Sequence, residues 1–167
     1  MRRAIAIALL IVIAILLQTT VFSEIRLLGA KPELLYLLTI VLALLDGPSE
    51  GAIAGFFGGM SEDFLLHQPK GITALTLTLL GYAIGLSRQY IVSASPLLPT
   101  ILVAGGTFVG AMFHGTVSFL LGQETQFGYL VRTALLSGLY GALLTPLAFP
   151  LIRRLSEYSK PRRVVRW

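Results

Sequence analysis

Apolar stretches long enough to form membrane helices alternate with short polar or glycine–proline breaks along the whole chain. The first stretch, residues 4–22, contains no charged residue and follows Arg2 and Arg3. A helix needs roughly 20 apolar residues to cross a hydrocarbon core about 30 Å thick, so this stretch predicts one membrane helix. It is too long for the core of a signal peptide, and the sequence after Gln18 offers no small-residue cleavage site, so we expect the helix to be retained.

Five more apolar stretches follow, and the breaks between them predict turns. Residues 46–50, Asp-Gly-Pro-Ser-Glu, separate the second stretch from the third. Because Gly-Pro between acidic residues is typical of a tight turn, the two stretches predict a helical hairpin. We expect its first helix to open at Pro32, since a missing N–H has no consequence at a helix start. The predicted spans after the first cover residues 34–45, 51–66, 72–86, 97–121 and 129–152.

The basic residues favour six spans over five. Cytoplasmic loops of membrane proteins carry an excess of Lys and Arg, and six spans place most of the 13 basic residues on the side of both termini. Only Arg26, Lys31, Lys70 and Arg132 then lie toward the other side. The predicted cytoplasmic residues are Arg2, Arg3, Arg88, Arg153, Arg154, Lys160, Arg162, Arg163 and Arg166.

The sequence therefore predicts an all-α integral membrane protein with about six short transmembrane helices in one bundle. The bundle would comprise residues 1–152, and residues 153–167 would form a basic cytoplasmic tail that attracts anionic lipid head groups. Composition agrees, because only 13% of the 167 residues are charged and the mean hydropathy is +0.81, whereas soluble domains carry roughly 25% charged residues. The net charge of +5 gathers at the chain ends, which favours a membrane-orienting signal over a nucleic-acid-binding face.

Catalytic chemistry has little support in the sequence. The chain has no cysteine, which excludes disulfides, thiolate metal sites and thiol nucleophiles. It also lacks the Gly-x-Ser-x-Gly, HExxH, P-loop and GxGxxG motifs. We therefore predict no catalytic residue, no cofactor and no metal site.

Small residues recur at four-residue spacing on the third predicted helix, at Gly51, Gly55 and Gly59. Such rows let helix backbones approach closely inside a membrane. The row has two interpretations: packing within the bundle, or a docking surface for the transmembrane helix of a partner protein. The first helix, which carries small residues at Ala4 and Ala8, is the other candidate docking surface.

Four ionisable residues at membrane depth are candidate functional or structural residues. Glu62 and Asp63 lie near the end of the third helix, where water can solvate them. Arg132 lies at similar depth in the sixth helix, so a pair between Asp63 and Arg132 is one hypothesis. His114 lies in the middle of the fifth helix. We interpret it as a neutral, hydrogen-bonded histidine, with a proton-transfer or metal-binding role as the alternative.

Several short segments form an ordered pattern along the chain. They are Gln18-Thr19-Thr20-Val21-Phe22, Lys31-Pro32-Glu33-Leu34-Leu35, the glycine-rich residues 51–59, the stretch 72–82, and Thr145-Pro146-Leu147 followed by Arg153-Arg154. Asp63 lies eight residues before Gly71 within this pattern. Taken in order, these segments resemble the family of the bacterial rod shape-determining protein MreD, and the chain departs from the family pattern at the turn His67-Gln68-Pro69-Lys70.

The resemblance implies a non-enzymatic membrane scaffold of the cell-elongation machinery, or elongasome, in the bacterial plasma membrane. Family members bind MreC, a protein with one membrane helix, and act with MreB, RodA and the penicillin-binding partner of RodA in regulating cell shape and peptidoglycan synthesis. The family fold is similar to the substrate-binding component of energy-coupling-factor transporters. A substrate-binding component of such a vitamin transporter is therefore the alternative function, with polar residues such as Gln18, Glu62 and Asp63 as its possible ligand contacts.

Overall fold

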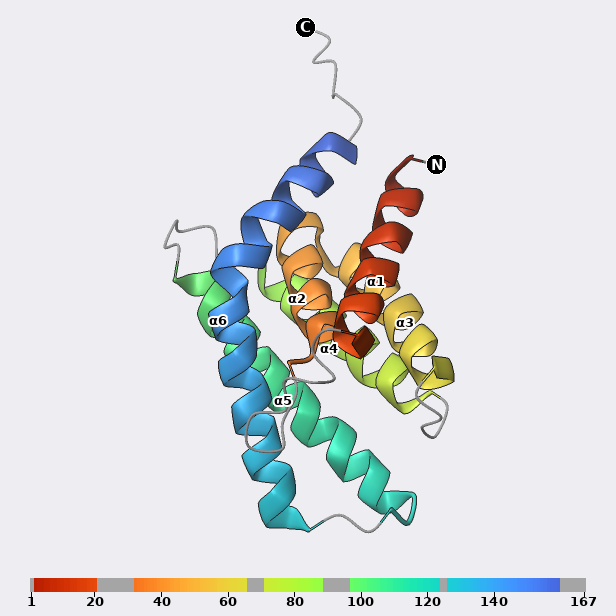
Figure 1. Cartoon of the computed structure of the whole chain (residues 1–167), viewed down its shortest axis with the longest axis vertical. Coiled ribbons are helices and arrows are strands. Elements are labelled where there is room, and N and C mark those ends of the chain that lie inside the picture. The colour runs from red at the N-terminus through yellow and green to blue at the C-terminus, as the bar shows by residue number, and fades with distance from the viewer. Residues whose placement is uncertain (1, 21–31, 66–70, 89–96, 124–125, 160–167) are drawn as a thin grey trace, which may run out of the picture.

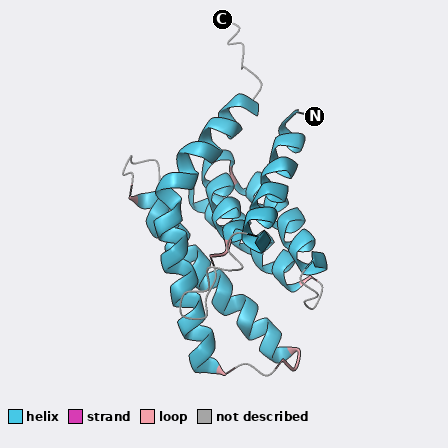
Figure 2. Ribbon diagram, viewed as in Figure 1, coloured by secondary structure: helices cyan, strands magenta, loops and turns pink. Residues whose placement is uncertain are grey.

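The computed structural model describes residues 2–20, 32–65, 71–88, 97–123 and 126–159. Within these ranges the chain forms six α-helices and no strand (Figure 2), as the apolar pattern predicts. The turn at residues 67–70 and the end of the predicted basic tail lie outside the described residues. The helices are α1 (Arg2–Thr20), α2 (Leu34–Asp46), α3 (Pro48–Leu65), α4 (Ile72–Ser87), α5 (Leu98–Leu120) and α6 (Phe127–Ser159).

The shortest helix, α2, lies at the centre of the bundle and contacts each of the other five helices. Every residue of α2 from Leu35 to Ala43 is buried. The outer helices, by contrast, expose large apolar side chains such as Phe57 on α3, Leu79 on α4 and Leu143 on α6. A protein surface this apolar is suited to contact with lipid rather than with water.

Helix length divides the bundle into two groups. The α5 helix and the Phe127–Glu157 part of α6 are each long and apolar enough to cross a membrane, whereas α2 and α4 are shorter apolar helices. In Figure 1, α5 and α6 form a hairpin that extends past α1–α4 at the lower end of the view. The start of α1 and the end of α6 both lie at the upper end, which we call the terminal end; we call the other the distal end.

Glycine and proline set the helix boundaries at the turns. Gly47 follows α2 with φ of 106°, a region that favours glycine, and Pro48 begins α3 directly after it. Gly71, with φ of 101°, precedes α4 in the same left-handed region. The α2 helix begins at Leu34 and not at Pro32, because Glu33 takes the N-cap position with a non-helical backbone.

The last helix continues further than its sequence indicates. Proline inside a helix removes one backbone hydrogen bond, yet α6 runs through Pro146 and Pro150 to Ser159. Prolines are tolerated in membrane helices where neighbouring groups satisfy the freed backbone atoms. The α6 helix thus continues past the predicted span, which ends at residue 152, and Arg153 and Arg154 belong to its final turns.

Candidate functional site

The glycine row of α3 packs against α4. Gly51, Gly55 and Gly59 are all buried. A Cβ atom at Gly55 would collide with the Leu77 carbonyl oxygen of α4, and one at Gly59 would lie 2.5 Å from the Cα of Ala74. A Cβ at Gly51 would lie 2.8 Å from the Gly81 carbonyl oxygen.

These contacts favour the first interpretation of Gly51, Gly55 and Gly59, packing within the bundle, over docking of a partner's helix. The chain's own α4 fills the face, so a partner has no access to it while the bundle is intact. The row instead allows α3 and α4 to approach backbone to backbone, as small residues do between membrane helices.

The face of α1 that points away from the bundle remains open. The helix packs on α2, α3 and α6. Ile5, Leu9, Val12 and Leu16 are each more than half exposed, at spacings of four, three and four residues. This spacing places them along one side of a helix, so α1 presents a continuous apolar strip to its surroundings.

Asp63 caps the start of α4 from the end of α3. Its side chain is fully buried. The Oδ2 atom accepts hydrogen bonds from the backbone N–H groups of Gly71, at 2.8 Å, and Ala74, at 3.2 Å, and Oδ1 accepts one from Thr73 at 3.3 Å. The first N–H groups of a helix have no partner within the helix, and the carboxylate also lies at the positive end of its dipole. Asp63 therefore links the ends of two helices.

Gln18 makes a similar link between three helices. Its side-chain oxygen accepts a hydrogen bond from the backbone N–H of Leu34, the first residue of α2, at 3.0 Å, and its amide nitrogen donates to Glu62 of α3 at 2.7 Å. The adjoining cavity, bordered by both side chains, has a volume of about 10 Å³, which is water-sized. Two features of the sequence could have indicated this role. Gln18 is an amide at the end of a long apolar stretch. The next helix, α2, starts without a capping side chain of its own.

His114 connects α5 to the same region. Its Nε2 atom lies 3.4 Å from the hydroxyl oxygen of Thr73, the residue whose backbone N–H donates to Asp63. The structure thus brings Glu62, Asp63 and His114 to the distal end of the bundle, with Gln18 and Thr73 between them. Among the described residues, no group of three or more His, Cys, Asp or Glu residues could hold a metal ion.

Arg132 does not join this cluster. It is exposed on α6, while Asp63 is buried and accepts three backbone hydrogen bonds. Figure 1 shows α3 and α6 on opposite sides of the bundle. The hypothesis of a pair between Asp63 and Arg132 is therefore corrected: within the described ranges the carboxylate is satisfied by α4.

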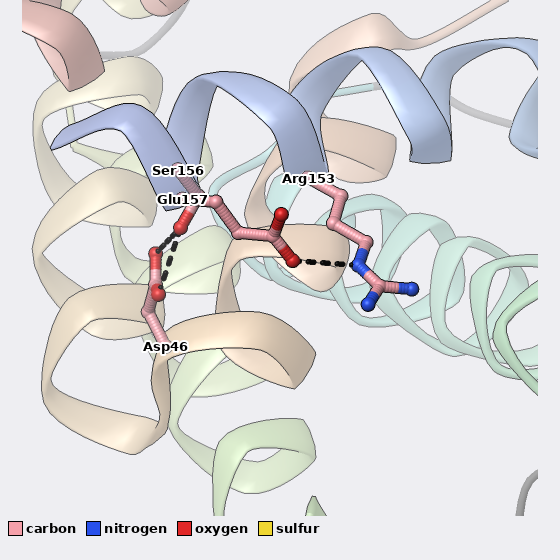
Figure 3. A network of polar contacts seen from close by, with 4 residues as sticks. All are labelled: Asp46, Arg153, Ser156 and Glu157. Atoms are coloured by element: carbon pink, nitrogen blue, oxygen red, sulfur yellow. Dashed lines mark hydrogen bonds and ion pairs between the residues drawn. The ribbon is translucent and has the colours of Figure 1, made fainter. Parts of the chain in front are cut away.

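A second polar contact joins distant parts of the chain at the terminal end (Figure 3). The Ser156 hydroxyl of α6 lies 2.9 Å from both carboxylate oxygens of Asp46, the last residue of α2, and donates its hydrogen there. One turn earlier on α6, Arg153 Nε donates to Glu157 Oε1 at 2.8 Å. Both partners of this pair are exposed, and such surface pairs contribute little to stability. No sequence signal pairs Asp46 with Ser156, because Asp46 lies in a Gly-Pro turn segment and Ser156 is 110 residues away.

The comparison with family models finds a match that spans nearly the whole chain. The family described as rod shape-determining protein MreD matches residues 1–155, a range that includes α1–α5 and most of α6. No curated protein and no solved structure matches the chain.

Proposed function

Because the chain belongs to the MreD family of rod shape-determining proteins, which are membrane proteins of the shape-determining Mre system, we propose that it is a non-enzymatic scaffold of the bacterial cell-elongation machinery. In this role it binds MreC and associated proteins, among them RodA with its penicillin-binding partner and MreB, and so regulates peptidoglycan synthesis. The family match over residues 1–155 is the observation that carries the proposal.

The polar residues of the distal end agree with a scaffold. Gln18, Glu62 and Asp63 are engaged in hydrogen bonds that hold helix ends together. Among the described residues, the cavity that Gln18 and Glu62 border is only water-sized, so it offers no room for a vitamin-sized ligand. We therefore favour the scaffold over the substrate-binding component of an energy-coupling-factor transporter.

In the proposed arrangement the chain crosses the plasma membrane six times with both termini in the cytoplasm. The termini carry most of the basic residues, and these favour the cytoplasmic side. The start of α1 and the end of α6 lie at the same end of the bundle (Figure 1), as an even number of crossings requires.

The open face of α1 is the docking surface that we propose for the single membrane helix of MreC. The sequence offered two candidate docking surfaces. The glycine row of α3 is covered by α4, so α1 is the surface that remains. Its strip, formed by Ile5, Leu9, Val12 and Leu16, is long enough to pair with another helix over several turns.

Co-purification from native membranes in mild detergent tests both parts of the proposal. Wild-type protein is compared with Leu9→Trp and Leu16→Trp, which change the shape of the α1 strip without adding charge. The matched control is Leu143→Trp, which makes the same change at a similarly exposed leucine of α6. We expect a single-span protein of the MreC type to co-purify with the wild type and the control, and to be depleted about tenfold in the α1 variants, as expected when a partner loses a central packing contact.

Two other outcomes have different meanings. Equal recovery of the partner with all variants would show that α1 is not the docking surface, while leaving the scaffold role supported. A bound vitamin or an energy-coupling-factor subunit in place of any elongation protein would refute the scaffold and support the transporter component.

A further inference from the structure

A shallow groove that is open to the surroundings lies along the distal part of α6. Among the described residues, its border is one face of this helix, and that face is apolar except for Arg132. Within the described part of the chain, Arg132 is the only Lys or Arg at the distal end, and no described residue pairs with it. The groove is lined by Phe127, Gly128, Val131, Arg132, Leu135 and Leu136.

The position of Arg132 along α6 matches the level of lipid phosphates. No charged residue occurs between Arg132 and Arg153, and at 1.5 Å per residue these two arginines are separated by about 32 Å. The hydrocarbon core of a bilayer is about 30 Å thick. When Arg153 lies at one head-group layer, Arg132 therefore lies at the other.

An exposed apolar strip connects the two arginines. Leu135, Leu139, Leu143, Leu147 and Leu151 follow one another at four-residue steps, and each is more than half exposed. Leu135 also borders the groove. The groove thus opens onto a surface along which an acyl chain can lie, with a cation at its outer end.

We propose that this groove binds one phospholipid of the outer leaflet, with the phosphate on the Arg132 guanidinium and an acyl chain between Val131, Leu135 and Leu136. Guanidinium groups hold phosphate through paired, charge-assisted hydrogen bonds. A cation at the level of the head groups is also attracted to anionic lipid. The α6 helix, which carries the site, and α3 lie on opposite sides of the bundle (Figure 1), and the site uses none of the residues of the distal polar cluster.

Photocrosslinking in nanodiscs that contain phosphatidylglycerol with a diazirine on one acyl chain tests the site. Labelled peptides are mapped by mass spectrometry. We expect the label to concentrate on the segment 127–136 and to fall by about tenfold in Arg132→Leu, the effect of losing one strong charged contact. Arg132→Lys, which keeps the charge but not the paired geometry, should retain an intermediate level of label.

A glycine pair provides a control that leaves the arginine in place. Gly128 borders the groove and Gly105 lies on α5, and a Cβ atom at either position meets no other atom within 4 Å. Gly128→Leu fills the groove without straining the fold and should reduce labelling of the segment 127–136, whereas Gly105→Leu should not. Circular dichroism and gel filtration verify that each variant is folded.

Three results would overturn the proposal. Label spread evenly over all exposed helix faces, unchanged by Arg132→Leu, would mean a general lipid coat only. If inorganic phosphate prevents labelling of the wild type, and Gly128→Leu is still labelled fully, Arg132 binds free anions and the groove holds no acyl chain. If labelling of the segment 127–136 disappears whenever an elongation protein is bound, Arg132 pairs with a carboxylate of that protein and not with a lipid phosphate.

Discussion

Replacing Asp63 with alanine should destabilise the fold more than any other polar substitution at the distal end. The substitution leaves three backbone N–H groups at the start of α4 without their acceptor. A buried donor left unsatisfied costs about 1–3 kcal/mol, and loss of a helix N-cap alone costs about 1 kcal/mol. Because water reaches part of a helix end, we expect a loss of ~3 kcal/mol, less than three full penalties.

Asparagine at position 63 removes the negative charge but keeps one oxygen acceptor, so it distinguishes the effect of the charge from that of the hydrogen-bond geometry. An amide oxygen in the place of Oδ2 keeps the bonds from Gly71 and Ala74, while the amide nitrogen replaces the acceptor of the longer, 3.3 Å bond from Thr73. Asp63→Asn should therefore lose only about 1 kcal/mol. The order of stability, wild type above asparagine above alanine, is the specific expectation.

Unfolding in mixed detergent–SDS micelles, followed by circular dichroism, measures these differences. Ser61→Ala is the matched control, because Ser61 lies on the same helix and its exposed hydroxyl bonds only to the Phe57 carbonyl one turn earlier. It should shift the unfolding free energy by less than ~0.5 kcal/mol. If Asp63→Ala is as stable as Ser61→Ala, the capping argument is refuted; if asparagine is as harmful as alanine, the charge and not the geometry matters.

Three further predictions use the same unfolding measurement. Gly55→Ala should destabilise by about 2 kcal/mol because its methyl group collides with the α4 backbone, whereas Gly105→Ala should be neutral or stabilising by about 0.5–1 kcal/mol; equal effects would contradict the packing. Gln18→Leu should lose about 2 kcal/mol, since it removes both an acceptor for the start of α2 and a donor to α3, and a neutral result would show that the cap is unimportant. Asp46→Ala and Ser156→Ala should be non-additive by about 1 kcal/mol in a double-mutant cycle, and strict additivity would exclude their coupling.

The helix boundaries could be predicted where the signal is local. Gly47, Pro48 and Gly71 are turn residues by their own backbone preferences, and the structure begins or ends helices beside each of them. The end of α6 has no such local signal: the predicted span stopped at residue 152, where the basic residues begin, whereas the helix continues to Ser159.

Contacts between helices were outside the reach of a single sequence. The glycine row at Gly51, Gly55 and Gly59 was visible, but not that α4 fills it, since every helix of the chain is apolar enough to be its partner. The same applies to Asp63, for which the sequence left open solvation by water or a pair with Arg132. The actual partners are backbone N–H groups, which carry no sequence signal.

The central position of α2 has a consequence for how the protein is made. With 13 residues, the helix is about 20 Å long, shorter than the roughly 30 Å hydrocarbon core of a bilayer. Its tight turn at Gly47 joins it directly to α3, so we expect the insertion machinery to accept the two as one unit. Until α4, α5 and α6 have been synthesised, the future core of α2 would face lipid, and the polar ends of α2 and α3 would have to remain near the head groups. Completion of the last helix is therefore the step that encloses α2 and gives the newly made chain its final arrangement.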